Sequence, residues 1–136
     1  MHEKTDAKVT PFDKGKFDYT SVTFYPDFTR FEQKELTEDM LGLMRKRVYD
    51  VAGISPKKTR VHLNKKKVEL SGFEEYAAKF ITALGKEEGE IFKMGERINE
   101  RWEVILAPSD GEFQQVSYVN GIATTRGGTH VTAIVD

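Results

Sequence analysis

Two patterns of apolar residues open the ordered part of the chain, one strand-like and one helical. Residues 19–25 alternate and are rich in β-branched and aromatic side chains, which predicts a strand that ends before Pro26. Residues 38–52 carry apolar side chains three and four positions apart, which predicts a helix capped by Thr37 and stopped by Gly53. The apolar stripe of this helix comprises Leu36, Met40, Leu43, Met44, Val48 and Val51.

The middle of the chain predicts a hairpin followed by a second helix. Residues 59–63 and 66–70 alternate on either side of Asn64-Lys65, which is a favourable turn sequence. Residues 71–74 read Ser-Gly-Phe-Glu, the pattern of a capping box at a helix start. The second helix is expected to end at Gly85, and its apolar stripe comprises Phe73, Ala77, Phe80, Ile81 and Leu84.

The last third predicts three more strands and the start of a third helix. The strands fall at about residues 89–97, 101–107 and 113–119, and the helix begins at His130 with Thr129 as its cap. Candidate core residues on the second of these strands are Trp102, Val104 and Leu106. The expected class is α+β, with a mixed sheet backed by helices.

The length of 136 residues suits one domain. We expect a lead-in segment at residues 1–17 and a partial domain at 18–136, truncated in its last helix because Asp136 lies only about two turns into it. The chain has no cysteine, which excludes disulfides and thiolate metal sites. No apolar run approaches the roughly 20 residues of a membrane helix, so no membrane partner is expected.

A formal net charge of −1 gives the whole chain no general attraction to nucleic acid, but the charges are segregated. Residues 41–67 contain nine basic residues and one acidic residue. The basic cluster on the predicted hairpin is Lys57, Lys58, Arg60, Lys65, Lys66 and Lys67. These side chains suit phosphate contacts along a DNA duplex, but lysines also protect exposed edge strands, and both interpretations stay open. A single-strand platform is disfavoured because no aromatic residue lies between them.

Enzyme signatures are missing from the sequence. It contains neither a phosphate-binding loop nor a nucleophile elbow, and its three histidines, His2, His62 and His130, lack metal-ligand spacing. The stretch Arg126-Gly127-Gly128-Thr129 precedes a helix, where backbone N–H groups can converge on an anion. A turn between strand and helix needs glycines for its geometry alone, so this pattern allows both interpretations.

Three separated stretches of the final third carry a resemblance to a known family. They are residues 99–104 (Asn-Glu-Arg-Trp-Glu-Val), 111–124 (Gly-Glu-Phe-Gln-Gln-Val-Ser-Tyr-Val-Asn-Gly-Ile-Ala-Thr) and 127–131 (Gly-Gly-Thr-His-Val). In this order they resemble the transducer region of eukaryotic DNA topoisomerase II. Within them we single out as family motif Asn120, Gly127, Gly128, Thr129 and His130. The likeness covers about residues 8–136 and is weakest at 57–95.

The resemblance implies a fold like the second domain of ribosomal protein S5. It implies a homodimeric parent in the nucleus that uses ATP and Mg to pass one DNA duplex through another. In such a parent, the transducer joins the ATP-binding domain to the cleavage core of the same chain. No catalytic residue, cofactor site or metal site is carried over to this stretch, and DNA contacts are expected from the basic cluster and Arg126. An alternative is a stand-alone S5-like module that binds nucleic acid.

Overall fold

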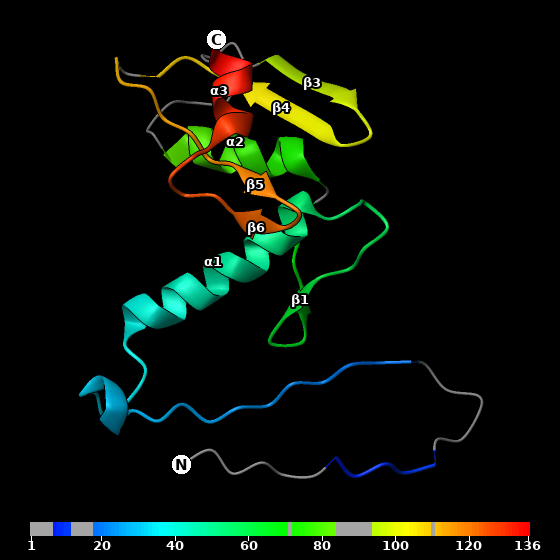
Figure 1. Cartoon of the computed structure of the whole chain (residues 1–136), viewed down its shortest axis with the longest axis vertical. Helices are drawn as coiled ribbons and strands as arrows, with labels where there is room; N and C mark the ends of the chain where they lie inside the picture. Colours follow the sequence, from blue (N-terminus) through cyan, green and yellow to red (C-terminus); the bar gives the residue numbers. More distant parts are fainter. Residues whose placement is uncertain (1–6, 12–17, 71, 84–93, 110) are drawn as a thin grey trace. The chain divides into compact units, whose positions relative to one another are not determined.

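The computed structural model describes residues 7–11, 18–70, 72–83, 94–109 and 111–136. The chain forms two compact units, residues 1–35 and 36–136, and Figure 1 traces their elements in chain order. No helix in the described part is both long and apolar enough to cross a membrane. The elements are η1 (Thr29–Phe31), α1 (Glu38–Ile54), β1 (His62–Leu63), β2 (Lys66–Lys67), α2 (Phe73–Ala83), β3 (Met94–Asn99), β4 (Trp102–Leu106), β5 (Tyr118–Val119), β6 (Ile122–Ala123) and α3 (Thr129–Val135).

The first unit contains the short helix η1 but no strand among its described residues. The strand predicted at 19–25 is therefore wrong. Its residues carry no backbone pairing, and Tyr19 and Tyr25 are 80% and 92% exposed. A strand needs a neighbour for its backbone hydrogen bonds, and the alternating sequence gives a propensity without supplying that partner.

Helix α1 begins as predicted and ends later than predicted. Thr37 accepts a hydrogen bond from the backbone N–H of Met40 at 3.3 Å, which confirms the cap. Gly53 does not stop the helix but lies buried within its last turn. The helix ends at Ile54, and the backbone of Ser55 after it is extended, because the following Pro56 disfavours a helical conformation there.

The face that α1 buries differs from its apolar stripe. Its buried residues are Asp50, Ala52 and Gly53, whereas Leu43 and Val51 of the stripe stay about half exposed. Helix α2 packs against α1 and buries Tyr76 and Ala78. The buried hydrophobic residues of the described part are Ala52 near the end of α1, Val68 directly after β2, and Tyr76 and Ala78 on α2, and they form its core.

The strands pair as three separate antiparallel hairpins, β1–β2, β3–β4 and β5–β6. The α+β class is confirmed, but the described strands do not join in one mixed sheet. Asn64 and Lys65 form the predicted β1–β2 turn with φ of 49° and 68°. Asn120 and Gly121 form a second turn of this kind with φ of 50° and 80°, between β5 and β6, and β6 was not predicted from the sequence.

The last third departs from prediction in three places. Only residues 118–119 of the strand expected at 113–119 are paired, and Gly128 rather than Thr129 is the N-cap of α3. Trp102 and Leu106 are 36% and 48% exposed, so they are not core residues, while Val104 is half-buried. Ser71 of the capping box, Gly85 and residues 89–93 lie outside the described residues.

Candidate functional site

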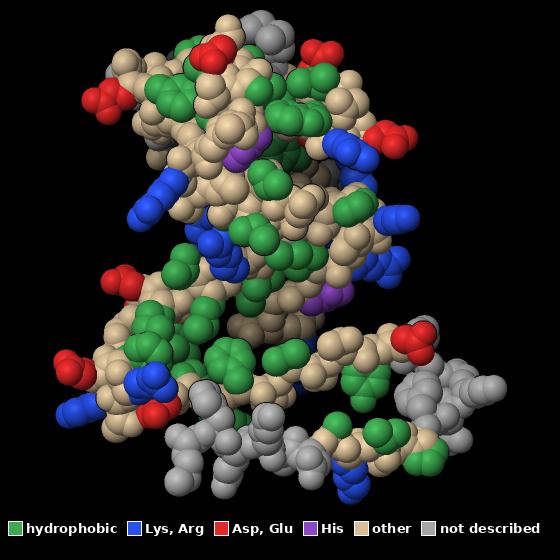
Figure 2. Space-filling view, viewed as in Figure 1, with side chains coloured by type: hydrophobic (Ala, Val, Ile, Leu, Met, Phe, Trp, Pro, Cys, Tyr) green, Lys and Arg blue, Asp and Glu red, His purple; other side chains and the backbone are tan. Residues whose placement is uncertain are grey.

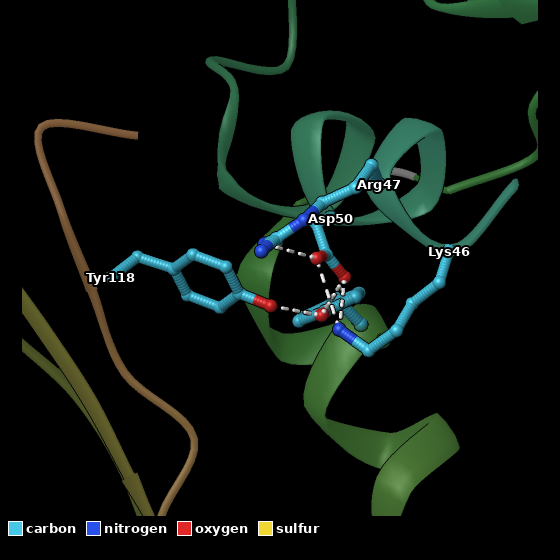
Figure 3. A network of polar contacts seen from close by, with 5 residues as sticks. Lys46, Arg47, Asp50 and Tyr118 are labelled. Atoms are coloured by element: carbon cyan, nitrogen blue, oxygen red, sulfur yellow. Dashed lines mark hydrogen bonds and ion pairs between the residues drawn. The ribbon is translucent and has the colours of Figure 1, made fainter. Parts of the chain in front are cut away.

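A buried carboxylate on α1 organises the main polar network of the second unit. The Asp50 side chain is 3% exposed and accepts hydrogen bonds from Lys46 Nζ at 2.9 and 3.0 Å and from Arg47 at 3.2 Å. Both cations come from the preceding turn of the same helix, at spacings that place side chains beside each other. Figure 3 shows Lys46 and Arg47 reaching Asp50 from α1, with Tyr118 approaching from a different segment.

Tyr76 connects this carboxylate to α2 and β5. Its hydroxyl lies 2.6 Å from Asp50 Oδ1 and 2.5 Å from the Tyr118 hydroxyl. Its ring packs edge-to-face against Phe80 and Tyr118, with centroids 5.1 and 6.1 Å away. The ring also covers Gly53, whose missing side chain leaves the space that Tyr76 occupies. The three elements are therefore joined around one tyrosine.

The electrostatics fix the direction of these hydrogen bonds. Burial acts to raise the pKa of Asp50, but the hydrogen bonds from Lys46 and Tyr76 and the charge of Lys46 outweigh it, so the pKa lies below its usual value. Asp50 is then ionised and can only accept. Burial, together with the bond to Asp50, raises the pKa of Tyr76, which stays protonated and gives its one proton to Asp50. Tyr118 must therefore donate to Tyr76.

A second network is centred on Ser117, the residue before β5, and holds the start of α3. The Ser117 hydroxyl lies 2.7 Å from Gln115 Oε1, 2.6 Å from the Thr124 hydroxyl and 3.2 Å from His130 Nε2. His130 also lies 3.1 Å from Thr124 Oγ1, and its ring packs beside Gly128. Since Ser117 directly precedes Tyr118, the two networks meet where β5 begins.

The contact between Ser117 and His130 does not make a nucleophile–base pair. Such a pair needs a third group to orient the base, and none of the described residues hydrogen-bonds to the other ring nitrogen of His130. The Ser117 proton is also engaged by Gln115 at a shorter distance. In the described part of the chain there is no group of three His, Cys, Asp or Glu residues that could hold a metal. The arrangement can hold elements together, and we assign it no bond-making chemistry.

The predicted site residues fall into two places. The basic cluster of Lys57, Lys58, Arg60, Lys65, Lys66 and Lys67 lies on the β1–β2 hairpin and the turn before it, with every side chain exposed. Arg126 is exposed on the loop before α3, and no described contact joins it to the hairpin. Figure 2 shows Lys and Arg side chains projecting from the surface of the chain.

The family-motif residues have conformational roles. Asn120 forms the β5–β6 turn, and Gly127 and Gly128 adopt φ of 71° and 152°, which favour glycine. Thr129 begins α3 and His130 belongs to the network with Ser117. Sequence reasoning missed Asp50, Tyr76, Tyr118 and Ser117. The only signal for Asp50 and Lys46 was their spacing of four on a helix, which is also common at exposed ion pairs.

Comparisons with known proteins identify the family of this chain. The DNA gyrase B family model matches residues 62–136. DNA topoisomerase 2 of Saccharomyces cerevisiae is 47% identical over 141 residues, covering 95% of this chain and 10% of that protein. DNA topoisomerase 2 of Arabidopsis thaliana is 41% identical over 133 residues, covering 96% of this chain and 9% of that protein. The chain thus spans about a tenth of the length of these relatives.

A solved structure agrees with the sequence matches. The ATPase region of Saccharomyces cerevisiae topoisomerase II superimposes with a TM-score of 0.72 and 48% identity, covering 82% of this chain and 28% of that one. The family match spans more than half of the chain, and the structural match extends beyond it. The chain therefore belongs to the DNA gyrase B family, as a fragment similar to part of the ATPase region of eukaryotic topoisomerase II.

Proposed function

We propose that this chain is the transducer part of an ATP-dependent type II DNA topoisomerase. In this role it couples ATP-driven closure of a dimer gate to the passage of double-stranded DNA. The observation that carries the proposal is the similarity to the ATPase region of a topoisomerase II, found in a chain that lacks phosphate-binding signatures of its own. A part of an ATPase region without such a signature is suited to transmit movement rather than to bind nucleotide.

The polar networks support a transmitting role. Asp50, Tyr76 and Tyr118 link α1, α2 and β5 by side-chain hydrogen bonds, and Ser117 continues the connection to His130 at the start of α3. Hydrogen-bond networks between packed elements can carry coupling between distant sites. A buried charge with several partners also favours one arrangement of these elements over others, because alternatives would leave it unpaired.

The proposal includes the surroundings expected for such a part. The parent would be a nuclear homodimer that binds double-stranded DNA, with the ATP-binding domain and cleavage core of the same chain as neighbours. ATP and Mg would act in the parent, away from the residues described here. The domain limits of 1–17 and 18–136 also stay predictions.

The alternative is a stand-alone S5-like module that binds nucleic acid. The exposed basic hairpin favours it, because this surface would work without the rest of a topoisomerase. The two proposals differ in what disrupting the Asp50 network would do. A coupling part would lose the connection between ATP use and DNA passage, whereas a binding module would only lose stability.

A chimaeric enzyme tests the coupling role. The matching segment of Saccharomyces cerevisiae DNA topoisomerase 2 is replaced by this chain, and ATP hydrolysis and DNA relaxation are measured together. We expect both activities to persist. Tyr118→Phe in the chimaera removes one hydroxyl from the network, and we expect DNA relaxed per ATP hydrolysed to fall by roughly 2- to 30-fold, as for a coupling loss of about 0.5–2 kcal/mol.

Val119→Ala serves as the control, because Val119 lies beside Tyr118 on β5 and is 40% exposed. This variant should keep the wild-type ratio of relaxation to hydrolysis. Equal falls in ATP hydrolysis and relaxation for Tyr118→Phe would show a loss of folded enzyme rather than of coupling, and would contradict the proposal.

The isolated chain should not bind ATP measurably. The reason is the lack of a phosphate-binding loop or of a Gly-x-Gly-x-x-Gly pattern in its sequence. Isothermal titration with Mg-ATP checks this expectation. A dissociation constant in the micromolar range would mean that a nucleotide site exists in the chain and that the division of labour proposed above is incorrect.

A further inference from the structure

Some basic side chains of the second unit are paired with a carboxylate, and others are not. On α1, Lys46 and Arg47 are paired with Asp50, and Arg45 lies 3.9 Å from Glu38. On the hairpin, Lys67 contacts Glu69 at 3.1 Å. The other five hairpin residues have no carboxylate within salt-bridge distance among the described residues. Five unpaired positive charges thus lie within residues 57–67, whereas the other described cations of this unit without a salt bridge, Lys79, Arg97, Arg101 and Arg126, are spread over separate segments.

The hairpin is held so that these charges face solvent. Val68 is buried at 6% exposure, and its backbone N–H donates to the carbonyl of Val61 at 2.9 Å. Val61 and Leu63 are half-buried. The apolar residues thus fix the hairpin to the protein, while the lysines at its turn and along its second strand project outward. This exposed set, Lys57, Lys58, Arg60, Lys65, Lys66 and Lys67, is called the basic hairpin surface below.

Protection of an edge strand does not account for this surface. Strands β1 and β2 are two residues long each, so they offer little backbone for another strand to pair with. Lys57, Lys58 and Arg60 lie before β1 and outside any strand. Edge protection would therefore leave three of the six positive charges without a role.

We infer that the basic hairpin surface binds the phosphate backbone of double-stranded DNA. Residues 57–67 hold six basic residues and no acidic one. Five of the six are lysines, which supply compact charges without the planar geometry that arginine uses for carboxylates. Single-stranded nucleic acid is disfavoured, because the segment has no Phe, Tyr or Trp on which bases could stack. Binding independent of sequence follows, since charge alone does not read bases.

The inference deepens the proposed function by giving this part its own contact with duplex. It can fail separately, because it is tested on the 136-residue chain alone, without ATP or DNA passage. The measurement is fluorescence anisotropy of a labelled duplex of about 20 base pairs, titrated at several salt concentrations. We expect weak binding to duplexes of unrelated sequence. The logarithm of the binding constant should fall linearly with the logarithm of the salt concentration, with a slope of about −0.9 for each phosphate contacted.

The main variant reverses four charges, Lys57→Glu, Lys65→Glu, Lys66→Glu and Lys67→Glu. Its matched control reverses four exposed charges elsewhere, Lys8→Glu, Lys34→Glu, Lys79→Glu and Arg101→Glu. Each Lys→Glu or Arg→Glu change lowers the formal net charge by two, so both variants carry −9, compared with −1 for the wild type. The hairpin variant should bind at least roughly tenfold more weakly than the control and with a shallower salt dependence. Circular dichroism establishes that both are folded.

Three outcomes would overturn the inference. One is equal binding by the hairpin and control variants, which would place DNA contact elsewhere or make it a matter of net charge. Another is tighter binding of polyglutamate than of duplex at matched salt, which would indicate an acidic protein partner. The third is tighter binding of single strand than of duplex. Conversely, Glu69→Gln frees Lys67 and should strengthen duplex binding, which a surface without DNA contact would not show.

Discussion

Gly53→Ala should lower the free energy of unfolding by about 3 kcal/mol, even though alanine favours helices. A Cβ at this position would lie 2.3 Å from Tyr76 Cγ and 2.6 Å from Tyr76 Cδ2. The ring cannot move aside easily, because it is 4% exposed and its hydroxyl is held by Asp50 and Tyr118. Either α2 shifts or both hydrogen bonds are lost. Urea unfolding followed by circular dichroism measures the change.

Gly42→Ala in the same helix is the matched control. Gly42 is exposed and a Cβ there would meet nothing within 4 Å. Relief of the glycine penalty should therefore raise the free energy of unfolding by about 0.5–1 kcal/mol. The two substitutions are chemically identical and should have opposite signs. Stabilisation by both would show that Tyr76 does not pack against Gly53.

Asp50→Ala should lower the free energy of unfolding by about 2–3 kcal/mol at neutral pH, since it removes the acceptor of a buried tyrosine hydroxyl. Lys46 and Arg47 are about half exposed, so water can solvate them, and the effect is smaller than for a fully buried pair. Asp50→Asn keeps an acceptor for Tyr76 and should cost less. Urea unfolding of the three proteins gives the comparison.

The Asp50 effect should depend on pH in a defined direction. Its pKa is lower in the folded chain than the unfolded value of about 3.9, so its stabilisation is complete above that value. The stabilisation is lost as the pH falls through the folded pKa. The stability difference between wild type and Asp50→Asn should be constant from neutral pH down to about pH 5 and shrink below about pH 4. A difference that grows on acidification would mean that burial dominates and raises this pKa.

Local sequence signals predicted the elements that depend on nearby residues. Thr37 caps α1 and Asn64-Lys65 turns the first hairpin, because each is decided within four residues. Asn120-Gly121 carries an equally strong turn signal. It joins β5 to β6, and β6 is only two residues long, too short to show an alternating pattern, so that tertiary contacts rather than alternation decide where pairing occurs.

The buried network could not be predicted in this way. Asp50 comes three to five residues after the basic run Arg45-Lys46-Arg47 on the same helix, a pattern that usually marks a solvated surface. Its burial arises from Tyr76, 26 residues later, whose approach requires a glycine at position 53. The resemblance in residues 99–131 located the family but named none of these partners. Packing between residues far apart in the sequence therefore determines this network, and local sequence patterns could not predict it.

The turn of the first hairpin has a consequence for how this segment can change. Lys65 adopts a φ of 68°, a left-handed conformation that costs a residue with a side chain about 1–2 kcal/mol and that glycine adopts freely. Asn-Gly would be the more stable choice for such a turn, as at Asn120-Gly121. The lysine at this position places a positive charge at the tip of the hairpin, at a cost in folding free energy. Lys65→Gly should therefore stabilise the turn while it removes a positive charge from its tip, so that folding stability and surface charge pull in opposite directions at this one position.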